Sequence, residues 1–125
     1  MIYVPKDLIQ FQSILHAFRH YIASSPYFDI VFTPKRGYIF LRLEKDFVDV
    51  TEIESPDELF EIFLHEISSD VRDLFLCGEH IDVDLYPAEI RESRRRILEY
   101  ICHLPEGMQS HYTERMDHYF KHCND

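Results

Sequence analysis

Apolar residues recur every three or four positions in four stretches of the chain, the spacing that places side chains on one face of an α-helix. In the first stretch, residues 6–23, Phe11, Phe18 and Ile22 fall on one stripe. Ser25 precedes a proline, which disfavours helical backbone and ends this helix. The other three stretches run over residues 55 to about 77, 87 to about 104, and 105 to the last turns of the chain.

Elsewhere apolar and polar residues alternate, as they do in half-buried β-strands. Residues 27–44 predict a β-hairpin around the turn TPKRG, in which Pro34 and Gly37 supply special backbone angles. A third strand is predicted over about 47–53, and a possible fourth over 80–86, where Ile, Val and Leu alternate with Asp.

The second strand of the hairpin has apolar residues on both faces. We expect Ile39, Leu41 and Leu43 to face the core. Tyr38 and Phe40 then lie on the outer face, which makes that face a candidate surface for a partner.

The second predicted helix has a well-defined start. Ser55 is a favourable N-cap, Pro56 suits the first helical position, and Glu58 completes a capping box with Ser55. The predicted order is therefore helix, three strands, helix, strand, helix, helix. This order indicates a single α+β domain over 1–125, with an antiparallel sheet of three to four strands packed against four helices.

Charge narrows the functions that are open to the chain. With 13 Lys and Arg against 23 Asp and Glu, the net charge is −10. Broad contact with a phosphate backbone needs a basic surface, so we do not expect nucleic acid as the main partner. The three glycines are far apart and form no phosphate-binding loop.

The three cysteines are odd in number and widely spaced, which favours a reduced, cytoplasmic protein. The first residues carry no signal-peptide pattern, and no apolar run has the length of a membrane span.

Eight histidines raise the question of a metal site. On the last helix His118 and His122 are four residues apart and could chelate one metal ion as a pair. A third ligand would have to come from elsewhere in the chain. We expect the pair to form part of a solvated helix face, with no cofactor, and keep metal binding as an alternative.

The segment RESRRR, residues 91–96, concentrates four of the basic residues in an acidic chain. Arg91, Arg94 and Arg95 share one helix face and are candidates for contact with a partner. Neighbouring glutamates offer the alternative that these arginines pair within their own helix.

No sequence signature of catalysis accompanies these features. The leading hypothesis is a non-catalytic, acidic protein-binding module, such as an adaptor, chaperone, inhibitor or immunity-type protein. Its expected partner is another protein, and we also expect a homodimer. Two alternatives stay open: a histidine-based metal protein or small hydrolase, and a regulator that contacts nucleic acid or an acidic partner through the arginine cluster.

Overall fold

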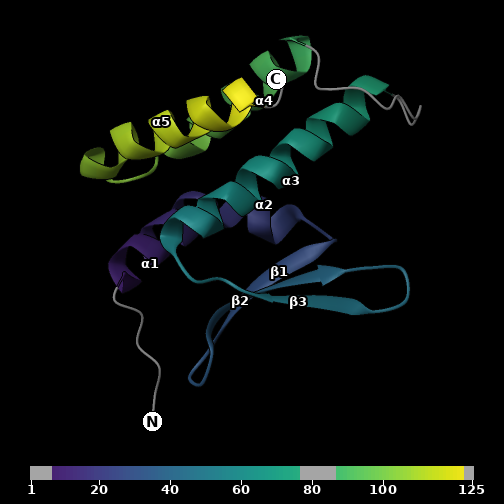
Figure 1. Cartoon of the computed structure of the whole chain (residues 1–125), viewed down its shortest axis with the longest axis vertical. Coiled ribbons are helices and arrows are strands. Elements are labelled where there is room, and N and C mark those ends of the chain that lie inside the picture. Colours follow the sequence, from purple (N-terminus) through teal and green to yellow (C-terminus); the bar gives the residue numbers. More distant parts are fainter. Residues whose placement is uncertain (1–6, 77–86, 123–125) are drawn as a thin grey trace. The chain divides into compact units, whose positions relative to one another are not determined.

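The computed structural model of the chain describes residues 7–76 and 87–122. Over these residues the elements follow in the order α1, α2, β1, β2, β3, α3, α4, α5 (Figure 1). An antiparallel sheet accompanied by helices is an α+β fold, which confirms the predicted class. The possible fourth strand at 80–86 lies outside the described residues.

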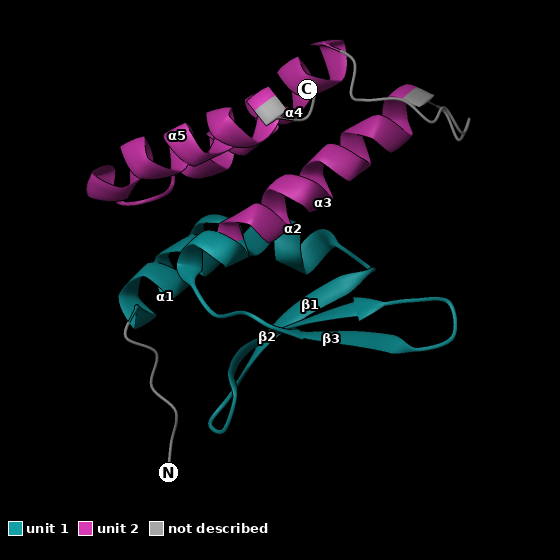
Figure 2. Ribbon diagram, viewed as in Figure 1, with its two compact units in different colours: residues 1–59 teal, residues 60–125 magenta. Residues whose placement is uncertain are grey.

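Two compact units divide the chain, residues 1–59 and residues 60–125 (Figure 2). Helix α3 begins in the first unit and continues in the second. That residues 1–125 form one domain stays a prediction.

The first unit opens with two helical segments, α1 (Leu8–Ala17) and α2 (Arg19–Ser24). They are separated at Phe18, whose backbone has φ −99° and ψ 12°. The hydrogen bonding continues across this residue, because the Phe18 amide donates to the Ile14 carbonyl and the Ile22 amide donates to the Phe18 carbonyl, each at 3.0 Å. The helix predicted over 6–23 is therefore present in two parts.

The sheet contains β1 (Phe28–Thr33), β2 (Gly37–Leu43) and β3 (Val48–Glu52), in that order and antiparallel throughout. Gly37 has φ 78°, the left-handed conformation that glycine adopts without strain. The Arg36 amide donates to Thr33 Oγ1 at 3.0 Å and closes the same turn. The predicted hairpin and third strand are confirmed.

Aromatic side chains connect α1 to one face of the sheet. The ring of Phe11 stacks on Tyr38 at a centroid distance of 4.7 Å. From β1, Phe32 contacts Tyr38 at 5.0 Å and Phe28 contacts Phe40 at 5.4 Å. All of these residues except Phe32, which is 43% exposed, belong to the core of the first unit. This side of the sheet is therefore called the helix-covered face.

The prediction for the two faces of β2 was right for Ile39, which is only 5% exposed, and wrong for Tyr38, Phe40 and Leu43. Tyr38 and Phe40, expected on the outer face, are only 6% and 8% exposed. Leu43, expected to face the core, is 58% exposed. The reversal has a physical cause: the large aromatic rings bury more apolar area against α1 than the aliphatic side chains would.

Helix α3 (Pro56–Leu76) starts as its sequence predicts. The Glu58 amide donates to Ser55 Oγ at 3.1 Å, which satisfies one amide of the first turn. Glu58 Oε2 in turn accepts from the Glu54 amide at 3.2 Å, one residue before the N-cap. The predicted cap by Ser55 is confirmed. The reciprocal bond of the capping box differs by one residue, because Glu58 accepts from the Glu54 amide and not from the Ser55 amide.

The second unit pairs α4 (Pro87–Ile101) with α5 (Glu106–His122) and includes most of α3. The rings of Phe60 on α3 and Tyr112 on α5 lie 4.7 Å apart. Ile97 and Met116 are fully buried. Gln109 Nε2 donates to the Leu104 carbonyl at 2.9 Å and so satisfies a backbone group in the turn between α4 and α5.

Near the end of α3, the apolar residues Leu74 and Phe75 are 59% and 46% exposed. None of the described helices combines the length and hydrophobicity that a membrane span requires.

Candidate protein-binding surface

The second face of the sheet is apolar as well, and Ile39 at one end of it is buried. The register places Leu41 directly opposite Val50, and Leu43 directly opposite Val48. Cross-strand partners project from the same side of a sheet, so these four side chains form one group. Val31 of β1 is the cross-strand partner of Ile39 and lies on the same side.

Much of this group is in contact with solvent. Leu43 is 58% exposed, and Val48 and Val50 are each 52% exposed. Phe47, in the turn between β2 and β3, is 63% exposed. We call the surface formed by Leu41, Leu43, Val48 and Val50 the open face.

An apolar open face is unusual for a small antiparallel sheet. The side of such a sheet that faces water normally carries polar residues in alternation with the buried ones. On β2 both sets are apolar, because Ile39, Leu41 and Leu43 alternate with Tyr38 and Phe40. Clustered exposed apolar side chains mark surfaces that bind other molecules.

Strand β3 is the edge of the sheet beside the open face. Its five residues are exposed, and β2 is its only partner strand within the described part of the chain. An edge strand offers backbone donors and acceptors for an additional strand. The open face and this edge therefore adjoin one another.

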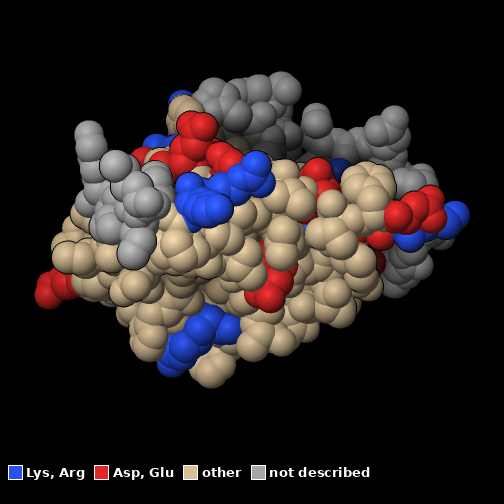
Figure 3. Space-filling model, turned by 90° about the horizontal axis from the view of Figure 1, so that it is seen from below, with Lys and Arg blue, Asp and Glu red and all other residues tan. Residues whose placement is uncertain are grey.

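Charged side chains are distributed in separate groups over the surface. The space-filling view shows such groups of Lys and Arg and of Asp and Glu, with broad areas of other residues between them (Figure 3). On β3 itself the two charged residues, Asp49 and Glu52, are both acidic. Glu52 Oε1 lies 3.4 Å from Arg36 Nε at an exposed position.

Tyr38 and Phe40, two of the predicted partner-binding residues, are in the core of the first unit. Their side chains pack against Phe11, Phe32 and Phe28. The apolar surface that the prediction sought on this strand lies on its other side, at Leu41 and Leu43. The signal for it was the alternation of Ile39, Leu41 and Leu43 with Tyr38 and Phe40, which gives both faces of β2 apolar residues.

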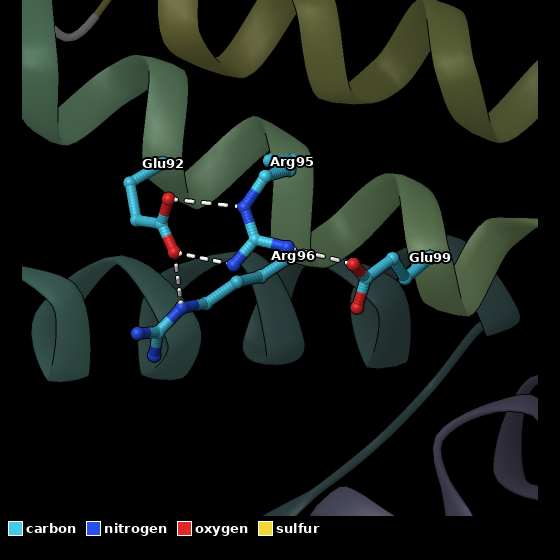
Figure 4. A network of polar contacts seen from close by, with 4 residues as sticks. All are labelled: Glu92, Arg95, Arg96 and Glu99. Atoms are coloured by element: carbon cyan, nitrogen blue, oxygen red, sulfur yellow. Dashed lines mark hydrogen bonds and ion pairs between the residues drawn. The ribbon is translucent and has the colours of Figure 1, made fainter.

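The arginine cluster on α4 pairs with carboxylates of the same chain. Arg95 donates to both oxygens of Glu92, at 2.6 and 3.0 Å, and to Glu99 at 2.7 Å. Arg96 Nε donates to Glu92 at 2.9 Å (Figure 4). Arg94 forms an ion pair with Asp117 of α5 at 2.9 Å, and Arg91 is exposed.

These contacts lower the pKa of Glu92 from 4.5 to about 2, chiefly through the hydrogen bonds from Arg95 and then from Arg96. The same pairing with Glu92 raises the pKa of Arg95. Burial, and next the charge of Glu99, raises the pKa of Tyr100. The geometry of Arg94 and Arg95 therefore matches the alternative of pairing within the chain, and their contact with a partner stays a prediction.

Both histidines of the predicted metal pair lie on α5. His118 is exposed, and His122 is the last residue of the helix. No group of three or more His, Cys, Asp or Glu with the spacing of a metal site occurs among the residues that the structure describes. Metal binding by His118 and His122 stays a prediction.

Sequence reasoning missed two polar residues inside the second unit. Glu89 and Ser93 of α4 are fully buried. They precede Ile97 and Ile101 at intervals of four residues and so continue the same helix face. The spacing of the apolar stripe could have indicated their burial, because the same four-residue interval, continued toward the start of α4, leads to both positions.

No family model, curated protein or solved structure matches this chain. The role of the open face is therefore inferred from its geometry.

Proposed function

We propose that this protein is a non-catalytic, acidic protein-binding module that contacts its partner through the open face of the sheet. A single observation carries the proposal: Leu43, Val48 and Val50 are each more than half exposed on one side of the sheet. Covering these side chains would remove apolar area from water, which contributes a favourable free energy of about 25 cal/mol for each Å² buried.

The composition of the chain agrees with this proposal. A net charge of −10 keeps copies of the protein apart at long range and favours partners with a basic surface. The proposal includes a cytoplasmic location, which is supported by the odd number and wide spacing of the cysteines. It also includes a homodimer, in which apolar contact through the open face would have to outweigh the repulsion between two chains of charge −10.

The test compares two aspartate substitutions at exposed apolar positions. Leu43→Asp places a charge in the open face, whereas Ile9→Asp places one at the start of α1, where the side chain is 78% exposed. Each tagged variant is used to capture proteins from the cells that produce the wild type, and each is also sedimented alone.

We expect a protein that binds the wild type to be retained by Ile9→Asp and lost by Leu43→Asp. If the partner is a second copy, sedimentation will show a wild-type dimer that only Leu43→Asp converts to a monomer. Equal behaviour of the two variants in both measurements would contradict the proposal.

A further inference from the structure

The backbone of β3 has a definite orientation within the sheet. The Glu44 amide donates to the Phe47 carbonyl at 2.9 Å, and the Ile53 amide donates to the Tyr38 carbonyl at 2.9 Å. Both bonds follow the register of β2 and β3 beyond the two ends of β3. In an antiparallel pair, successive residues of a strand direct their amide and carbonyl groups alternately toward and away from the partner.

This alternation divides β3 into two sets. Asp49 and Thr51 are an even number of positions from Phe47 and Ile53, so their backbone groups point toward β2. Val48, Val50 and Glu52 therefore direct their amides and carbonyls away from β2, toward the edge of the sheet. The side chains of Val48 and Val50 belong to the open face, so the outward backbone groups lie beside apolar side chains.

We infer that the edge of β3 binds an extended segment of another protein as a fourth antiparallel strand, and that this segment alternates apolar and basic residues. This inference deepens the proposed function and rests on it. An added strand would exchange backbone hydrogen bonds with Val48, Val50 and Glu52, the mode of recognition in which a peptide extends a sheet.

The side chains of β3 specify what the segment carries. Positions opposite Val48 and Val50 would lie on the open face and favour apolar residues. Asp49 is the cross-strand partner of Arg42, and Glu52 lies 3.4 Å from Arg36, so each carboxylate already has one arginine nearby. On the outer side of β3, positions opposite Asp49 and Glu52 can supply a second cation, and they favour Lys or Arg because opposite charges stabilise directly paired positions. Read in its own direction, the antiparallel segment is basic, polar, apolar, basic, apolar.

A second copy of β3 fits this edge less well than a basic segment. With two copies paired about Val50, Glu52 of each would lie opposite Val48 of the other, and Asp49 would lie opposite Thr51. Neither carboxylate would meet a basic residue. Two chains of charge −10 also repel each other. The other predicted strand, 80–86, carries Asp82 and Asp84 and contains neither Lys nor Arg.

The probe is a synthetic peptide with blocked ends and the central sequence Lys-Thr-Val-Lys-Val. A control peptide of the same composition, Lys-Lys-Thr-Val-Val, breaks the alternation, and a second control replaces both lysines with glutamate. Binding to the full chain is measured by calorimetry at low salt and again at 0.5 M salt, a concentration at which exposed charges are largely screened beyond about 4–5 Å.

Val50→Pro is the decisive variant. Proline removes one outward amide, whereas the hydrogen bonds between β3 and β2 come from other residues, and edge strands tolerate proline at such positions. Val50→Thr keeps the amide and the β-branched shape and serves as the matched control. Asp49→Asn removes one charge and tests the basic position without altering the backbone.

We expect the alternating peptide to bind at least tenfold more tightly than either control peptide, and its affinity to fall with salt. Val50→Pro should weaken binding about tenfold, which corresponds to the loss of roughly one backbone hydrogen bond. Val50→Thr should stay within about threefold of the wild type, and Asp49→Asn should weaken binding by a few-fold.

Three results would overturn the inference. One is equal binding of the alternating and non-alternating peptides, which would indicate attraction by charge alone. Another is equal binding by the wild type and Val50→Pro. The third is a wild-type dimer that Val50→Pro, but not Val50→Thr, converts to a monomer, which would assign the edge to a second copy. In the first two cases the result of the Leu43→Asp test would be unaffected. A failure of this inference can therefore be distinguished from a failure of the proposed function.

Discussion

The ring of Phe11 on α1 stacks on the ring of Tyr38 on β2, with centroids 4.7 Å apart and planes inclined by 27°. Because side chains alternate along a strand, this contact also assigns Leu41 and Leu43 to the other side of the sheet. The candidate binding surface is therefore the face of the sheet opposite the one that α1 covers.

The two faces of β2 should differ sharply in their contribution to stability. Phe40→Ala removes a buried ring and should lower the free energy of unfolding by about 3–5 kcal/mol. Leu43→Ala removes an exposed side chain and should change it by no more than about 0.5 kcal/mol. Urea unfolding measures both, and equal losses would mean that the two faces are covered alike.

The start of α3 depends on one side-chain hydrogen bond. Ser55→Ala leaves the Glu58 amide without the acceptor that lies 3.1 Å away, and should cost about 1 kcal/mol of stability. Ser110→Ala, at an exposed position within α5, is the control and should be neutral or slightly stabilising. A Ser55→Ala protein as stable as the wild type would exclude this cap as a stabilising contact.

The pairing of Glu92 should appear in the pH dependence of stability. Its pKa is lowered from 4.5 to about 2, so the folded state favours the charged carboxylate. The resulting stabilisation is complete above pH 4.5 and is lost as the pH falls from 4.5 toward 2. Glu92→Gln should therefore be less stable than the wild type at pH 7, by an amount that shrinks over that range.

The exposed carboxylate of Glu106 provides the comparison, through Glu106→Gln in the same urea titrations. A difference between Glu92→Gln and the wild type that stays constant from pH 7 to pH 2.5 would show that Arg95 and Arg96 do not perturb Glu92.

Amide exchange distinguishes the two sets of backbone groups in β3. The amides of Asp49 and Thr51 point toward β2 and should exchange slowly with deuterium, whereas those of Val48, Val50 and Glu52 should exchange rapidly. Magnetic resonance resolves these amides individually. Uniform protection along β3 would contradict the assignment of its outer edge.

The elements of this fold could largely be predicted from the sequence because each carries a local signal. Gly37 marks the tight turn, Ser55 and Pro56 mark the start of α3, and the alternation after Tyr27 marks the hairpin. The faces of β2 could not be predicted, because both are apolar and only the tertiary contact with Phe11 selects one.

The exposed apolar side of β2 could not be assigned from the sequence. A strand that is apolar on both sides indicated that one side would lie outside the core, and the structure exposes Leu43 and buries Tyr38. That the exposed side binds a partner stays a prediction. The burial of Glu89 was equally hard to foresee, since a glutamate in the first turn of a helix is ordinarily explained by the helix dipole.

Photo-crosslinking from the open face tests the central claim most directly. A benzophenone amino acid is introduced in the producing cells in place of Leu43 in one variant and in place of Ile9 in another. We expect a discrete crosslinked species from position 43 and none from position 9. No crosslink from position 43, or the same species from both positions, would contradict the claim that the open face binds a protein.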